Sequence, residues 1–195
     1  NMYGLKDNVA RKAGTMGKEE NKEMEFWTQE EFQEFLECVA DKPISYYAFE
    51  MLYWTGIREG KLLALTPSDF NFEKKTLRIN KSYQRLEGED VITDPKTPKS
   101  NRTIVMPDFL IIEMEDFIKS IYGIKIDDRI FTISKNYLHH EMDRGAKLAG
   151  VKRIRIHGLR HSHISLLINL GFSALAIGER VGHEAVDITY HYAHL

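Results

Sequence analysis

IRIHGLRHSHISLL, residues 154–167, is the stretch on which the interpretation of the whole chain depends. It begins as an apolar, β-branched run, which is typical of a buried strand, and it continues with the Leu and Ile content of a buried helix. Four charged or titratable side chains lie between these two parts: His157, Arg160, His161 and His163. We therefore expect a strand that leads into a helix over about 157–170, with charge concentrated at the junction.

On that helix, His157, Arg160 and His161 are spaced i, i+3 and i+4 and share one ridge. A purely structural interpretation is open, in which Arg160 pairs with a buried acid and His163 is a packed, hydrogen-bonded histidine. A metal site is less favoured, because Gly158 stands where a zinc-protease helix needs Glu and no carboxylate completes the ligand set. An anion site fits best, because a guanidinium and an imidazole at a helix N-terminus are good partners for a phosphodiester.

The overall charge of the chain does not point to a nucleic-acid partner. The 195 residues, 43% of them apolar, are enough for one compact domain, and their net charge is −2. Residues 144–178 nevertheless contain no acid and six bases, which are Arg144, Lys147, Lys152, Arg153, Arg155 and Arg160. A local basic surface on a near-neutral protein can bind phosphate, although a solvated basic edge is the simpler interpretation.

The low cysteine content and the lack of long apolar runs suggest the compartment of the protein. The single cysteine, Cys38, excludes an intrachain disulfide and has the spacing of a buried residue in a helix. No apolar run approaches 18 residues, and no signal peptide is recognisable. We expect a cytoplasmic protein with no membrane partner.

Capping signals and apolar periodicity divide the chain into helices around one small sheet. Thr28 and Glu31 form a capping box ahead of a first amphipathic helix. Pro43 opens a second helix that Gly56 ends, and a short third helix ends before Pro67. Further helices are expected over 108–121, 134–150, 157–170 and 173–182, with a helical tail from 187. Alternating patterns predict three short antiparallel strands, over 76–83, 89–93 and 102–107. The predicted fold class is α+β and mainly α-helical, with a small three-stranded antiparallel sheet inserted after the third helix.

Four separated motifs carry the functional signal: TGIREGKLLAL, DPKTPKSNRTIVMP, HGLRH and ERVGHEAVDITYHYAHL. In this order they resemble the first box, the β-hairpin, the His-x-x-Arg box and the last box of the tyrosine recombinase (phage integrase) family. The positions that match the family's catalytic residues are Arg58, Lys96, His157, Arg160, His183 and Tyr192. The resemblance is to integrases of phages and conjugative transposons, and it implies a DNA-associated protein of bacterial or phage origin. It implies a catalytic domain over 25–195, with 1–24 as the linker from an absent N-terminal core-binding domain.

The resemblance implies a site-specific recombinase that integrates and excises a mobile element through a covalent protein–DNA intermediate. Tyr192 would attack a DNA phosphate, forming a 3′-phosphotyrosyl bond and freeing a 5′-hydroxyl, so that the strand can rejoin another end without ATP. His157 would take the tyrosine proton, and Lys96 would protonate the leaving 5′-oxygen. Tyr190 is the rival nucleophile, and Lys99 is the first rival of Lys96.

The same resemblance implies that side chains, and no metal or other cofactor, stabilise the reacting phosphate. Arg58 and Arg160 would hold its nonbridging oxygens, and His183 would hydrogen-bond to it. Four further basic residues are candidates for DNA contacts: Lys99, Arg102, Arg153 and Arg155. The implied partners are double-stranded DNA at attachment sites and a homotetramer on that DNA, or a monomer for this fragment. An excisionase or a host DNA-bending protein is a candidate accessory partner.

The sequence departs from the family pattern at Lys61, three residues after Arg58, where the family usually has an acid. A lysine there would repel Arg58 or Arg160 at short range, while Glu59 on the same helix projects elsewhere. Two alternatives stay open, of which the first rests on this departure and the second on the chemistry that the two enzyme classes share. One is a catalytically impaired, recombinase-derived regulator that only binds DNA, and the other is an enzyme similar to type IB topoisomerases.

Overall fold

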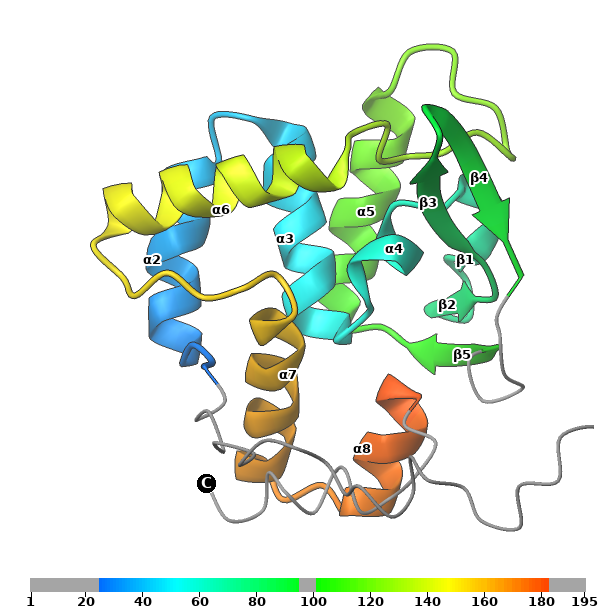
Figure 1. The fold of residues 1–195 in the computed structure, drawn as a ribbon. Helices are drawn as coiled ribbons and strands as arrows, with labels where there is room; N and C mark the ends of the chain where they lie inside the picture. Colours follow the sequence, from blue (N-terminus) through cyan, green and yellow to red (C-terminus); the bar gives the residue numbers. More distant parts are fainter. Residues whose placement is uncertain (1–24, 95–100, 183–195) are drawn as a thin grey trace, which may run out of the picture.

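The computed structural model describes residues 25–94 and 101–182. Its helices are α2 (Gln29–Val39), α3 (Pro43–Thr55), α4 (Glu59–Leu62), α5 (Asp108–Ser120), α6 (Lys135–Ala149), α7 (Gly158–Asn169) and α8 (Ala174–Val181). A short 3₁₀ helix, η1 (Pro67–Asp69), follows α4. Helices make up most of the domain, and the small sheets lie together at one side of it (Figure 1), so the predicted α+β, mainly helical class is confirmed. The predicted linker 1–24 and the predicted helical tail from 187 lie outside the described residues.

The capping residues that the sequence predicts define the helix ends. At α2, the Thr28 amide donates to Glu31 Oε2 at 2.8 Å, and the Glu31 amide donates back to Thr28 Oγ1 at 3.3 Å. Gly56 ends α3 in the left-handed conformation, with φ of 61°. Ser134 and Ser173 cap α6 and α8 through their hydroxyl oxygens. These helix boundaries are therefore set locally.

The predicted sheet is present, but its strands are combined differently. The three-stranded antiparallel sheet has the order β1–β2–β5, with β1 at Phe70–Asn71, β2 at Thr76–Ile79 and β5 at Arg102–Val105. Strands β3 (Ser82–Leu86) and β4 (Glu89–Thr93) form a separate hairpin. The prediction of one strand over 76–83 was wrong, because β2 ends at Ile79 and β3 begins at Ser82. There the Lys81 ammonium turns inward to the buried Asp69 carboxylate at 2.7 Å.

The expected strand at 154–156 is also absent. Residues 151–155 have no regular structure, although Ile154 and Ile156 are buried in the main core. Next to this segment, the indole N–H of Trp27 donates to the Lys152 carbonyl at 2.6 Å, and the Trp27 amide donates to Ser162 Oγ at 2.8 Å. The apolar run therefore packs in the core as an irregular segment, and the hydrogen bonds of Trp27 hold the chain on either side of it.

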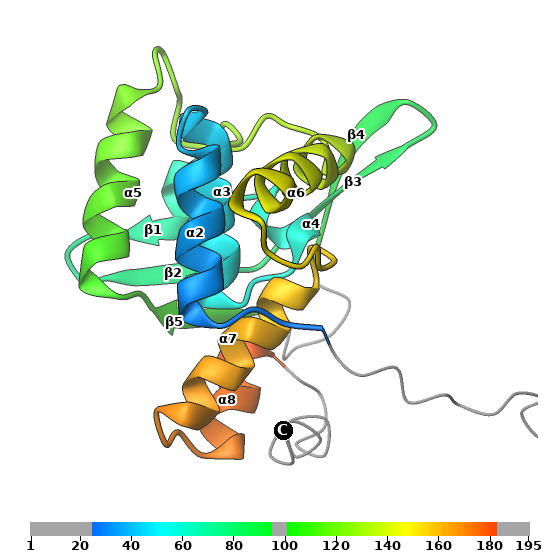
Figure 2. The same ribbon diagram turned by 90° about the vertical axis from the view of Figure 1, so that its left-hand side faces the viewer.

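Helix α3 is the centre of the molecule and packs against α2, α5 and α7. Figure 2 shows α2 and α6 on one side of the domain, where they cross closely. Aromatic rings fill the space between α2 and α3; Phe32 stacks on Tyr53 with ring centroids 3.9 Å apart. Cys38 of α2 is only half-buried. None of the helices in the described residues is long and apolar enough to cross a membrane.

The crossing of α2 and α6 depends on Gly145. A Cβ at this position would lie 2.4 Å from Phe35 Cε2 and 2.7 Å from Val39 Cγ1. We expect Gly145→Ala to lower the free energy of unfolding by roughly 1–3 kcal/mol, because the clash in a buried aromatic contact outweighs the gain in helix propensity. Lys147→Ala, on the exposed side of the same helix, is the control. Urea denaturation measures both; a Gly145→Ala protein as stable as the wild type would contradict the close crossing.

Candidate active site

Three of the six matched catalytic positions lie in the described residues, and the structure brings them together. Arg58 is the N-cap residue of α4, His157 directly precedes α7, and Arg160 lies in the first turn of α7. The positive charges of Arg160 and Arg58 both act on the His157 imidazole, which places the three side chains in one neighbourhood. The other three positions, Lys96, His183 and Tyr192, lie outside the described residues, as do the rivals Lys99 and Tyr190.

Arg160 is the structural centre of this neighbourhood. Its side chain is buried, and its two terminal nitrogens donate to the carbonyls of Gly56 and Val181, each at 2.7 Å. These carbonyls belong to the end of α3 and the end of α8, so one guanidinium joins three helices. Gly56 itself leaves no room for a side chain, because a Cβ there would lie 2.7 Å from His163 Cδ2.

The histidines at the start of α7 have lowered pKa values. Burial, followed by the charges of Arg160, Arg58 and Arg155, lowers the pKa of His157. His161 packs edge to face against His157, with ring centroids 4.9 Å apart, and burial lowers its pKa to about 4. A neutral imidazole at position 157 can accept a proton at neutral pH. Within the described residues there is no group of three or more His, Cys, Asp or Glu side chains that would hold a metal ion.

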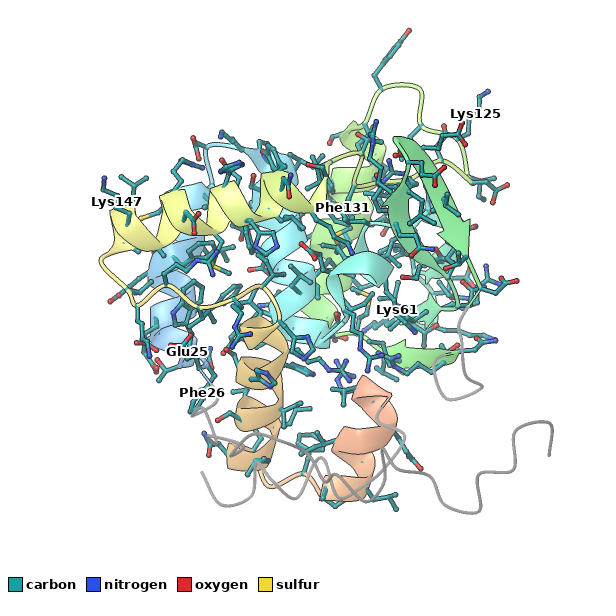
Figure 3. The ribbon with its side chains drawn as sticks, viewed as in Figure 1. Glu25, Phe26, Lys61, Lys125, Phe131 and Lys147 are labelled. Atoms are coloured by element: carbon teal, nitrogen blue, oxygen red, sulfur yellow. The ribbon has the colours of Figure 1, made fainter. Side chains whose placement is uncertain are left out.

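Lys61 lies inside the cationic neighbourhood, between α4 and β5 (Figure 3). Its side chain is only 6% exposed. Burial and the charges of Arg102, Arg58 and Arg160 lower its pKa to about 8. The expected repulsion between Lys61 and both arginines is therefore present. Lys61 thus puts a cation at the position where the resemblance implied an acid.

Arg102 of β5 was predicted as a DNA contact, and the structure places it within the same neighbourhood. Its Nε donates to the Arg180 carbonyl at 2.7 Å. Its two terminal nitrogens are buried, and neither has a hydrogen-bond partner among the described residues. Burial and the charges of Arg58 and Arg180 lower the pKa of Arg102 to about 10. A guanidinium with two buried donors and no acceptor is suited to an anionic ligand.

Arg180, which was not among the predicted site residues, connects α8 to the rest of the site. Its three nitrogens donate to His163 Nε2 at 3.0 Å, to the Val105 carbonyl at 2.8 Å and to the Trp54 carbonyl at 3.2 Å. His163 is therefore the packed, hydrogen-bonded histidine that the sequence suggested. A basic residue beside the apolar face of α8, in the GERVGH motif, was the available signal for Arg180.

The basic segment 144–178 is less available for DNA than its composition indicates. Arg144 pairs with Asp41 and with Glu141, each at 2.8 Å. Arg153, a predicted DNA contact, donates to Asp143 at 2.7 Å. Arg155 is exposed, and its charge acts on both His157 and His161. Arg155 is thus the predicted surface contact that the structure places beside the candidate active site.

This arrangement agrees with the outcome of comparisons with known proteins. The model of the phage integrase family matches residues 25–195. The chain belongs to the phage integrase family. It is 31% identical over 204 aligned residues to the ICEBs1 integrase of Bacillus subtilis, covering 97% of this chain and 54% of that protein. It is 30% identical over 154 residues to the integrase of Staphylococcus phage L54a, covering 70% and 44%. The chain thus spans about half the length of these relatives.

Solved structures confirm the fold of a tyrosine recombinase catalytic domain. The Tn1549 transposon integrase in complex with a circular intermediate DNA superposes with a TM-score of 0.76 at 22% identity, over 89% of this chain and 62% of that one. The catalytic domain of bacteriophage HP1 integrase superposes with a TM-score of 0.63 at 21% identity, over 88% of each chain. At these identities the likeness establishes the fold and leaves residue roles to be argued.

The buried charge of Lys61 predicts a specific pH dependence of stability. We expect Lys61→Met to raise the free energy of unfolding at pH 7 by roughly 1–3 kcal/mol, because it removes a desolvated cation from among other cations. The folded pKa of about 8 lies below the ordinary 10.5, so between these values the unfolded chain binds the proton more tightly. The wild-type protein should therefore gain stability relative to Lys61→Met as the pH rises from 8 to 10.5.

Urea denaturation across this pH range measures the difference, with Lys147→Met as the control at an exposed site. An advantage of Lys61→Met that stays constant up to pH 10.5 would contradict the lowered pKa. A loss of stability on replacing Lys61 would mean that its charge is compensated in the fold.

Proposed function

We propose that this protein is a site-specific DNA recombinase of a mobile element, which cuts and rejoins DNA through a 3′-phosphotyrosyl intermediate. The observation that carries the proposal is the convergence of Arg58, His157 and Arg160, from two separate segments of the chain, in one cationic site. Two guanidiniums and a neutral imidazole suit a phosphodiester that gains negative charge in a pentavalent transition state. Family membership supports the same reaction class, and both integrase relatives are named for mobile elements or phages.

In this proposal, the arginines bind the phosphate and His157 manages the proton of the nucleophile. Arg160 is held by the carbonyls of Gly56 and Val181, so its guanidinium is preorganised beside the place where the phosphate would bind. Arg58 approaches from the start of α4 and completes the pair. The lowered pKa of His157 keeps its imidazole able to accept the proton of a tyrosine hydroxyl. No step of this scheme requires a metal ion.

The remaining roles are assigned by motif. Tyr192 is the nucleophile, Lys96 protonates the leaving 5′-oxygen, and His183 hydrogen-bonds to the phosphate. Arg102 and Arg155 contribute DNA contacts from the site itself, and Lys99 and Arg153 are further candidates for DNA contacts. The active assembly is a homotetramer on attachment-site DNA, with an excisionase or a host DNA-bending protein to control direction.

A second candidate function is a regulator that binds DNA at this site without cutting it. The buried Lys61 is the observation that favours it, because the additional cation tightens phosphate binding in the ground state as well as in the transition state. Binding both states equally gives no acceleration of the chemical step. The two candidates therefore predict the same DNA affinity and different covalent chemistry.

Covalent trapping separates them. The full-length gene product is mixed with a nicked duplex from the end of its element, in which the freed 5′ fragment diffuses away, and the products are run on a denaturing gel. We expect a slow-migrating protein–DNA adduct from the wild type and from Tyr190→Phe, and none from Tyr192→Phe. We also expect Arg160→Lys to lose adduct by about 100-fold, because a point charge cannot replace the fork that holds the phosphate.

Lys61→Glu is the arm that tests the regulator. An adduct from the wild-type chain overturns the regulator. Intact DNA binding without an adduct, together with an adduct from Lys61→Glu, would overturn the recombinase proposal and identify a catalyst inactivated at this position. An adduct that survives Tyr192→Phe would overturn the assigned nucleophile.

A further inference from the structure

A groove of about 510 Å³ lies on a part of the domain that the proposed chemistry does not use. Its walls are α2 and the start of α5, and its floor is α3, which Figure 1 shows between the other two helices. Four aromatic side chains line it: Phe32, Tyr46, Trp54 and Phe109. The rings of Trp54 and Phe109 meet edge to face, with centroids 5.2 Å apart. The groove is therefore a set of aromatic faces held in fixed orientation.

A buried carboxylate lies in the floor of this groove. Glu50 of α3 is 4% exposed, and its Oε2 has no hydrogen-bond partner in the described part of the chain. Glu113 of α5 is close enough for its charge to act on Glu50, and one of its own oxygens is likewise buried without a partner. Neither carboxylate forms an ion pair with a Lys, Arg or His among the described residues. An uncompensated buried carboxylate is costly and needs a cation or a proton.

In the isolated protein, protonation of Glu50 removes the uncompensated charge. Burial and the charge of Glu113 raise the pKa of Glu50 to about 7, while hydrogen bonding from Trp54 acts in the opposite direction. Burial, followed by the charges of the same two carboxylates, raises the pKa of Tyr46 to about 12. Glu37 on α2 adds a further acid at the wall. The groove can therefore exchange its proton for a ligand cation near neutral pH.

We propose that this groove binds an arginine or lysine side chain presented by a partner protein. The carboxylates of Glu50 and Glu113 would take the charge, and the faces of Tyr46 and Trp54 would take the cation and its aliphatic stem. The volume accommodates a basic side chain together with one apolar neighbour. DNA is excluded as the occupant, because the carboxylates of Glu37 and Glu50, which line the groove, and that of Glu113, which acts on Glu50, repel phosphate. The proposal does not rest on the proposed function, since it uses none of the residues of the phosphate site.

A matched pair of peptides tests it. Acetyl-Leu-Arg-Leu-amide and acetyl-Leu-Gln-Leu-amide are titrated into the ¹⁵N-labelled full chain at pH 8, and the indole N–H signals are followed by NMR. We expect the arginine peptide to shift the Trp54 signal saturably and the glutamine peptide to bind at least about tenfold more weakly. The Trp27 indole, which is bonded to the Lys152 carbonyl, serves as an internal reference.

Variants locate the binding. Glu50→Gln, which keeps the shape and removes the charge, should weaken the arginine peptide by about tenfold, and Glu113→Gln provides a second reading if Glu50→Gln fails to fold. Glu34→Gln, an exposed acid elsewhere on α2, should bind as the wild type does. Equal binding of both peptides, no saturable shift up to roughly 10 mM, or full binding by the folded Glu50→Gln variant would overturn the proposal. Self-association that is lost in Glu50→Gln would instead assign the groove to a second copy of the chain.

Discussion

The buried guanidinium of Arg160 holds the architecture of the site together. It donates to the carbonyl of Gly56, at the end of α3, and to that of Val181, at the end of α8. Both carbonyls lie at helix ends, where backbone acceptors have no partner within the helix and need one from elsewhere. Arg58 follows Gly56 by two residues, so the hydrogen bond from Arg160 to the Gly56 carbonyl also helps to position Arg58. A residue that would bind the phosphate thus also builds the site.

The second constraint is electrostatic. A chain with net charge −2 concentrates Arg58, Lys61, Arg102 and Arg160 around one place. Burial, followed by repulsion from neighbouring cations, lowers the pKa of Lys61 and Arg102. Such an arrangement costs folding free energy and is compensated when an anion binds. Three of the surface bases of 144–178, Arg144, Lys152 and Arg153, are meanwhile paired with acids, among them Asp41, Glu25 and Asp143. Phosphate recognition therefore depends on the buried cluster more than on net charge.

Local signals made much of this predictable from the sequence. The capping box at Thr28, the left-handed Gly56 and the serine caps act within a few residues, so their helices begin and end where expected. The spacing of His157 and Arg160 placed both at the start of α7. Long-range contacts were not predictable. The break after β2 depends on Lys81 reaching Asp69, and the irregular segment at 154–156 depends on Trp27, more than a hundred residues away. The roles of Arg102, Arg180 and Glu50 likewise come from neighbours distant in sequence.

Hydrogen exchange of an Arg160→Lys variant, measured by mass spectrometry against the wild type, tests whether the Arg160 guanidinium joins the ends of α3 and α8. Lysine keeps the charge but cannot donate to two separate carbonyls at once. The account predicts faster exchange in α8 and in the 56–62 segment, with α2 and α6 unchanged. Unchanged protection of α8, or a loss of protection spread evenly over α2 and α6, would contradict the claim that this guanidinium joins the two halves of the site.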